Sequence, residues 1–232
     1  MPPVHVHLTT VAEARAAGVL EAYRAGLTDE ERARHARMRA DPRGDEFLVG
    51  RALLHHALER HAPGWPRRFI ARPHGRLEVA GLPVSFNLAH AEGLVVVAVA
   101  DSLVGVDVEK VDPGRTERAV WEDHFAPPEI AALAALPPAE QCERFFRYWT
   151  LKEAYLKARG MGLGALPLRE FWFQLEPSIR IVFSPALPDA PGRWRFAQLR
   201  VGTDFLLAVA LVAREPIALS VERGLPQAGE LF

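Results

Sequence analysis

The sequence contains a single cysteine, Cys142, among its 232 residues, so it cannot form a disulfide within one chain. A chain without disulfides suits a reducing compartment, and we expect it in the cytoplasm. Cys142 falls in an expected amphipathic helix, where a cysteine more often packs as a small apolar side chain than acts as a nucleophile. The N-terminal residues lack a charged region followed by an apolar run, so we expect no signal peptide.

Long apolar runs and an excess of either charge are also missing. The longest apolar run, Leu94 to Ala100, has the length of a strand, whereas a membrane-spanning helix needs about 20 apolar residues. The chain carries 28 basic and 29 acidic residues, which gives a formal net charge of −1. This balance gives no support to a nucleic-acid or membrane-surface role, although it leaves room for a local patch.

Lysine is scarce, because only three of the 28 basic residues are lysines: Lys110, Lys152 and Lys157. Wherever a positive charge serves only to solvate the surface, this chain uses arginine. All three lysines lie beside acidic residues, in two short segments. Those two segments are therefore the first candidates for a functional site.

The order of the expected elements predicts the fold class. Helices are expected at residues 28–39, 45–60, 127–136 and 139–159, and strands at 3–8, 84–88, 94–100, 104–111, 180–183 and 205–212. Helices followed by antiparallel strands occur in both halves, which predicts an α+β fold of two similar subdomains, residues 1–103 and 104–232. The small residues 89–93 are expected to form a turn, and residues 223–232 a loose tail.

The segment Val104 to Val111 alternates between apolar and other residues. In a strand, residues two apart share a face, so Asp107 and Glu109 would point the same way as Gly105. The two carboxylates would then lie about 7 Å apart along the strand. The glycine beside them would leave room for a ligand. A strand with one solvated face is the commoner explanation of such alternation, so this segment alone does not decide the matter.

A third acid, Glu153, lies on the apolar side of the long expected helix. At 100° per residue it shares one stripe with Phe146, Trp149 and Leu156. An ion pair with Lys157, one turn later, would add only about 0.2–0.5 kcal/mol on an exposed helix. A cation shared with Asp107 and Glu109 would better explain an ionised group on this side. Three oxygen ligands favour Mg²⁺ or Mn²⁺, and hence a substrate with phosphate groups.

Three segments together resemble the signature motifs of a known family. Gly105 to Glu109 (Gly-Val-Asp-Val-Glu) and Trp149 to Lys157 (Trp-Thr-Leu-Lys-Glu-Ala-Tyr-Leu-Lys) resemble the two motifs of the 4′-phosphopantetheinyl transferase superfamily. Phe86 to His90 (Phe-Asn-Leu-Ala-His) resembles the upstream motif of its larger, surfactin-synthetase-activating (Sfp-type) branch. Each motif alone is weak, but the ordered set is specific. The resemblance spans residues 28–163 and does not extend to the C-terminal third.

The resemblance implies a pseudo-twofold monomer that binds coenzyme A in the cleft between its two halves. It implies transfer of the 4′-phosphopantetheine group to a serine of an apo acyl or peptidyl carrier protein, with release of 3′,5′-ADP. Fatty-acid, polyketide and nonribosomal-peptide carriers would all be candidates. The implied site residues fall into four groups: Mg²⁺ ligands Asp107, Glu109 and Glu153; a pyrophosphate contact, Lys157; nucleotide-end and phosphate contacts Arg43, Arg51, Arg76 and His90; and a general base, Glu153 or Glu129.

Two segments depart from the family pattern. Ala89 and Ala91 stand where the upstream motif usually has serine, which puts one side-chain contact to the cofactor in doubt. The family's Gly-Lys-Pro sequence is Gly75-Arg76-Leu77 here, and arginine keeps the charge. The arginines between residues 32 and 43 fit a solvated helix face and a phosphate-facing patch equally well.

Several other interpretations stay open at this point. His5 and His7 lie two apart on an expected strand, but with no third ligand nearby the pair does not predict a metal site. His55 and His56 point to different sides of a helix, so a joint site is not expected. The rival functions are a magnesium-dependent hydrolase acting on a nucleotide pyrophosphate and a non-catalytic module that binds coenzyme A or a carrier protein.

Overall fold

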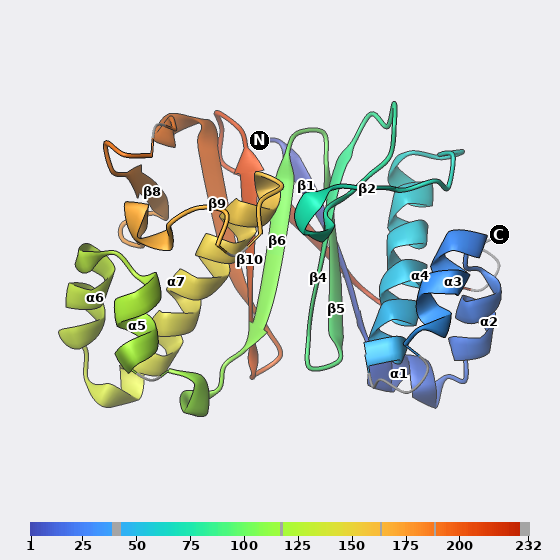
Figure 1. The fold of residues 1–232 in the computed structure, drawn as a ribbon, viewed down its shortest axis with the longest axis horizontal. Helices are drawn as coiled ribbons and strands as arrows, with labels where there is room; N and C mark the ends of the chain where they lie inside the picture. The colour runs from blue at the N-terminus through green and yellow to red at the C-terminus, as the bar shows by residue number, and fades with distance from the viewer. Residues whose placement is uncertain (39–42, 117, 163, 188, 228–232) are drawn as a thin grey trace.

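Two long helices flank the strands in the computed structural model (Figure 1), which describes residues 1–38, 43–116, 118–162, 164–187 and 189–227. The helices are α1 (Val11–Ala16), α2 (Leu20–Ala25), α3 (Asp29–Ala36), α4 (Arg43–His61), α5 (Arg118–His124), α6 (Pro127–Ala134) and α7 (Pro138–Ala158). No helix in these ranges is both long enough and apolar enough to span a membrane.

The strands of the described chain form two main sheets. One sheet has the order β11 (Ala218–Arg223), β1 (Pro3–Thr10), β5 (Leu94–Ala100) and β4 (Ser85–Ala91). The other has the order β6 (Val104–Lys110), β10 (Phe205–Val212) and β9 (Trp194–Val201). Two small hairpins pair β2 (Ile70–Ala71) with β3 (Leu77–Glu78), and β7 (Phe171–Gln174) with β8 (Arg180–Phe183). The predicted α+β class is confirmed, because α4 packs on the first sheet and α7 on the second.

The last strand does not stay with the second half of the chain. β11 pairs in parallel with β1, with Pro3 opposite Ala218 and His7 opposite Glu222. After β11, the Tyr23 hydroxyl donates a hydrogen bond to the carbonyl of Pro226 at 3.0 Å. The expectation of a loose tail is therefore wrong for residues 223–227, while residues 228–232 lie outside the described chain. The subdomain boundary near residue 104 stays a prediction. β11 follows that boundary in the sequence but belongs to the sheet formed by strands that precede it.

β4 extends beyond the expected strand of residues 84–88, into the small residues that were expected to form a turn. The strand continues through Ala91, and the turn consists of Glu92 and Gly93, both with positive φ. Ala89 pairs with Val96 and is buried, so it is part of the sheet where a turn was expected.

The two sheets meet along β4 and β6, where side chains link the strands. The side chain of Asn87 accepts a hydrogen bond from the backbone N–H of Val106 at 2.9 Å. The hydroxyl of Ser85 accepts one from the N–H of Val104 at 3.2 Å. Asn87, part of the upstream motif, thereby holds β6 in place beside β4.

The alternation of β6 places its apolar and acidic residues on opposite faces. Val104, Val106 and Val108 are buried in a cluster that includes residues of β1, β5 and β10 from both sheets. The opposite face meets α7. A Cβ atom on Gly105 would lie 2.1 Å from the backbone oxygen of Ala154 and 2.3 Å from the nitrogen of Ala158. Gly105 therefore lets α7 cross β6 closely, and the expectation that it makes room for a ligand is wrong.

Gly105→Ala is expected to destabilise the protein by about 3 kcal/mol, the upper end of the usual cost of overpacking. The added methyl group would meet helix backbone, which cannot move aside as a side-chain end can. Chemical denaturation would measure the change in the free energy of unfolding. Gly192→Ala is the matched control, because a Cβ there meets nothing within 4 Å. It should stay within about 0.5 kcal/mol of the parent, and equal effects of both substitutions would contradict the close crossing.

Candidate active site

A cleft of about 750 Å³ opens between α4 and the β2–β3 hairpin on one side and β6 and α7 on the other. Both halves of the chain contribute to its walls. Eight of the nine predicted site residues line it: Arg43, Arg51, Arg76, His90, Asp107, Glu109, Glu153 and Lys157. The ninth, Glu129, is not among the lining residues.

The acidic part of the cleft is built where α7 crosses β6. Lys157 donates a hydrogen bond from Nζ to Oδ1 of Asp107 at 2.6 Å. Arg115 donates one from Nη1 to Oε2 of Glu109 at 2.7 Å. Glu153 lies one turn before Lys157 on α7, so the close crossing at Gly105 brings all three carboxylates together. Three acids face two bases here, which leaves a surplus of negative charge.

Two oxygens in this cluster are buried without a hydrogen-bond partner in the described chain, namely Asp107 Oδ2 and Glu153 Oε1. Burial raises the pKa of Asp107 above its usual value. Burial, followed by the nearby Asp107 carboxylate, raises the pKa of Glu153 to about 7. Buried polar atoms normally have partners, so these two oxygens fit a site that receives a cation.

In the present arrangement Asp107 and Glu109 each bind a basic side chain, Lys157 and Arg115 respectively. Within the described ranges, the ligand atoms of Asp107, Glu109 and Glu153 do not form a group in which all lie within 4.8 Å of one another. Burial acts to lower the pKa of Lys157, but the Asp107, Glu153 and Glu109 carboxylates outweigh it and raise that pKa. Lys157 therefore carries a positive charge where a cation would bind.

The opposite wall is basic and comes from α4 and β4. Arg51 is buried between the rings of Phe47 and Phe69, with its guanidinium carbon 5.0 and 5.3 Å from the two ring centres. Its Nε lies 3.3 Å from Oε1 of Glu31. Burial lowers the pKa of Arg51 to about 10, so it stays charged at neutral pH. His90 is half exposed, with Nδ1 3.4 Å from Oε2 of Glu46.

Comparison with known proteins adds to this geometry. Residues 103–210 match the family model described as the 4′-phosphopantetheinyl transferase superfamily. A 4′-phosphopantetheinyl transferase of Bacillus subtilis is 30% identical over 176 residues, 75% of this chain and 76% of that protein. The 4′-phosphopantetheinyl transferase HetI of Nostoc sp. is 30% identical over 215 residues, 89% of this chain and 87% of that protein.

The chain belongs to the 4′-phosphopantetheinyl transferase superfamily. The predicted family is thus confirmed, and with it phosphopantetheinyl transfer as the class of enzyme activity. Among solved structures, the Chronobacterium ammoniagenes ACPS–CoA complex is similar at 18% identity, over 48% of this chain and 98% of that chain, with a TM-score of 0.35.

Glu129, a candidate base by its resemblance to the family, lies outside the cleft. Its side chain is only 1% exposed and forms an ion pair with Lys152 at 2.9 Å. It also accepts hydrogen bonds from the backbone N–H groups of Ala126 and Phe173 at 3.0 Å each. A carboxylate so enclosed has no path to a substrate in the cleft. This enclosure favours a structural role for Glu129, and a general base at this position stays a prediction.

Arg76 lines the cleft, but its guanidinium already has partners. Its Nη1 donates hydrogen bonds to the carbonyls of Lys157 and Ala158, both at 2.9 Å, and so caps the C-terminal end of α7. An arginine at this end of a helix interacts favourably with the helix dipole. Arg76, which stands where the family often has the lysine of Gly-Lys-Pro, thus holds the end of α7 in place and also lines the cleft.

Sequence reasoning missed or left open several lining residues. Arg34 lines the cleft, which favours the phosphate-facing interpretation for that arginine of the 32–43 segment. Arg115 was not predicted, because it lies in a short 3₁₀ turn, Pro113–Arg115, with no periodic pattern. Trp149, which also lines the cleft, was predicted as part of an apolar stripe and of a signature motif, without a role in the site. The scarcity of lysine pointed to the two segments that hold Lys110, Lys152 and Lys157, and of these three Lys157 lines the cleft.

Proposed function

We propose that this enzyme transfers the 4′-phosphopantetheine group of coenzyme A to a serine hydroxyl of an apo acyl or peptidyl carrier protein, with release of 3′,5′-ADP and dependence on Mg²⁺. The observation that carries this proposal is the pairing of two walls. Carboxylate oxygens that are buried without a hydrogen-bond partner among the described residues face a wall that carries Arg43, Arg51 and His90. A cleft of opposite charges suits a substrate with several phosphate groups bound together with a cation.

The donor set fits magnesium better than zinc. Asp107, Glu109 and Glu153 are hard oxygen ligands, and Mg²⁺ or Mn²⁺ prefers such ligands over imidazole or thiolate. When bound, the ion would neutralise the charge that builds on the pyrophosphate oxygens. For Asp107 and Glu109 to bind it, Lys157 and Arg115 would turn away from their present partners. Both side chains would then be available to bind the phosphates.

The residues of the cleft support a direct displacement. The serine oxygen attacks the β-phosphorus of coenzyme A, and the bond from that phosphorus to the bridging oxygen breaks, which frees 3′,5′-ADP. Lys157 and Arg51 stabilise the charge that develops on the phosphate oxygens. Glu153, a carboxylate that lines the cleft, takes the serine proton. Arg43 and His90 hold the nucleotide end, as the family resemblance implies.

One chain supplies both walls of the cleft, so we propose that the enzyme acts as a monomer. Its lone cysteine, Cys142, is partly buried and packs beside the core around α7, which fits the reducing cytoplasm that we propose as its location. The carriers of fatty-acid, polyketide and nonribosomal-peptide synthesis are the substrates to compare.

Intact-mass spectrometry of a panel of apo carrier proteins tests the proposal. We expect each accepted carrier to gain the mass of one phosphopantetheinyl group when it is incubated with enzyme, coenzyme A and Mg²⁺. The gain should vanish with EDTA and in the Asp107→Ala variant. Liquid chromatography of the same mixture should show 3′,5′-ADP in equal amount.

Two outcomes would overturn the proposal in different ways. Turnover of coenzyme A without any carrier would indicate a hydrolase that uses the same acids. Binding of coenzyme A with no turnover on any carrier, and with affinity unchanged in Asp107→Ala, would indicate a non-catalytic module.

A further inference from the structure

A second cluster of metal-binding side chains lies where α4, β1 and β11 meet. His5 and His7 come from β1, His56 and His61 from α4, and Glu222 from β11. None of these residues lines the acidic cleft. The sequence showed only the pair on β1, because the other three residues are brought there by the fold.

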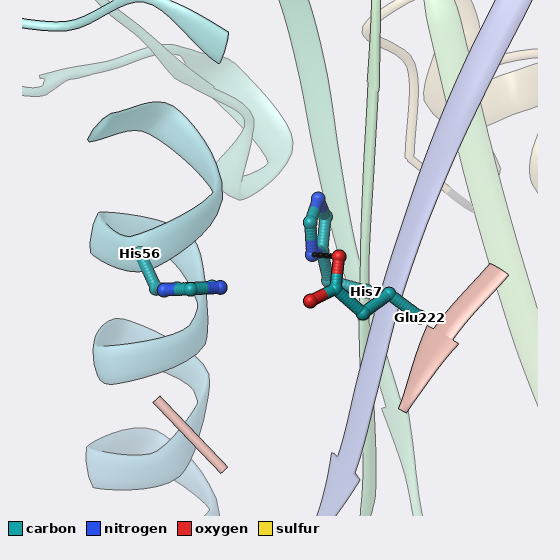
Figure 2. Close-up of side chains that lie close together, drawn as sticks. All are labelled: His7, His56 and Glu222. Atoms are coloured by element: carbon teal, nitrogen blue, oxygen red, sulfur yellow. Dashed lines mark ion pairs between the residues drawn. The ribbon is translucent and has the colours of Figure 1, made fainter. Parts of the chain in front are cut away.

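Three of these residues are arranged as a ligand set. One ligand atom each from His7, His56 and Glu222 lies within 4.8 Å of the other two. Nδ1 of His7 is 3.8 Å from Oε2 of Glu222. Figure 2 shows the His56 ring extending from α4 toward the other two side chains. All three line a small cavity of about 200 Å³, which leaves room for a further ligand.

The surroundings of His7 prepare its Nδ1 atom for a metal. Its Nε2 lies 2.9 Å from Nε2 of His61, so one of these two nitrogens carries the hydrogen. His7 is 3% exposed, and burial, followed by the nearby His61 and other basic groups, lowers its pKa to about 3. His7 is therefore neutral at physiological pH. If its Nε2–H donates to His61, Nδ1 keeps its lone pair facing Glu222, as in metal ligands oriented by an outer hydrogen bond.

We propose that His7, His56 and Glu222 bind a divalent transition-metal ion such as Zn²⁺, at a site separate from the acidic cleft. Two imidazoles and one carboxylate suit zinc and its neighbours, and not magnesium. Zinc bonds of about 2.0–2.1 Å to nitrogen place neighbouring ligands roughly 3.3 Å apart. The partly exposed His56 and the exposed Glu222 can close the remaining distance by side-chain rotation, while His7 stays fixed.

The proposed ion would join three segments that are far apart in the sequence. β11 is the last strand, in chain order, of the sheet β11-β1-β5-β4, and it carries Glu222. At present Glu222 accepts a hydrogen bond from Arg60 at 3.0 Å, and this exposed arginine takes the place of the cation. Metal binding would replace Arg60 and fasten β11 to α4. Metal binding at this site would therefore stabilise the folded protein.

Calorimetric titration of the metal-free full-length protein with Zn²⁺ tests the site. We expect one equivalent to bind to the parent and to Asp107→Asn, and none to His56→Gln or Glu222→Gln. His61→Gln removes the partner that orients His7 and should weaken binding about 10–100-fold. Arg60→Gln should tighten binding, because it removes the competing cation. Zn²⁺ should also raise the melting temperature of the parent, because it binds the folded state.

His5→Gln is the matched control, since it removes a neighbouring imidazole that lies outside the three-residue set. It should leave the stoichiometry unchanged. Circular dichroism would confirm that each variant is folded. The proposal is overturned if His56→Gln and Glu222→Gln still bind one equivalent, or if Asp107→Asn is the variant that loses it. A gain of affinity in Arg60→Gln cannot arise from misfolding, and its absence would also count against the site.

Discussion

Lys152→Met should lower the free energy of unfolding by about 3–5 kcal/mol, the cost of leaving one partner of a buried ion pair unpaired. Lys152 is fully buried, and its Nζ lies 2.9 Å from Oε2 of Glu129. The same Nζ donates hydrogen bonds to the carbonyls of Leu168 and Phe171 at 2.7 and 2.6 Å. Methionine keeps much of the side-chain length, so the loss would come from the charge and the donors. Urea denaturation would measure it.

The double variant Lys152→Met with Glu129→Gln separates charge from packing. It should lose less stability than Lys152→Met alone, because no uncompensated charge then stays buried. Glu129→Gln alone, assayed where it is folded, should not show the about 10²–10⁴-fold loss of kcat that removal of a general base causes. A loss of that size in a folded protein would restore Glu129 as a candidate base.

Glu153→Gln should lower kcat by about 10²–10⁴-fold, the usual contribution of a general base. Glutamine has the same shape but can neither take a proton nor neutralise a cation. Burial and the neighbouring Asp107 carboxylate raise the pKa of Glu153 in the folded protein from the ordinary 4.5 to about 7. The ionised carboxylate therefore costs stability, and that cost grows as the pH rises from 4.5 to 7. In metal-free protein at pH 8, the melting temperature of Glu153→Gln should therefore equal or exceed that of the parent.

Steady-state rates of carrier modification, measured at several Mg²⁺ concentrations, would test this result. Glu143→Gln is the matched control, because Glu143 lies on the same helix, is half exposed and pairs with Arg200. It should leave kcat unchanged. A large fall in melting temperature together with the fall in kcat would show that Glu153 has a structural role instead.

The predictable part of the site is the part that local periodicity encodes. Alternation along β6 was enough to place Asp107 and Glu109 on one face, and the helical stripe was enough to place Glu153 among apolar residues. The close crossing that joins these two surfaces was not predictable, because it depends on which backbone atoms lie opposite Gly105. The sequence pattern around a glycine is the same whether a ligand or a helix fills the space beside it.

Contacts between residues far apart in the sequence were the other feature that could not be predicted. Glu129 resembles a catalytic acid in its local sequence, and only the positions of Lys152 and of the Phe173 N–H favour a structural role for it. Arg115 and the histidine cluster were missed for the same reason. Each depends on neighbours that lie far along the chain or in a segment without periodicity.

The parallel pairing of β11 with β1 has a consequence for synthesis on the ribosome. β1 is made well before β11, and its partner on one side, β5, also precedes β11 in the chain. Its other edge stays unpaired until residues 218–223 have left the exit tunnel. An unpaired edge of this kind is a template for association with other chains. The nascent N-terminal half therefore depends on β11 for protection, and truncation before β11 would expose that edge permanently.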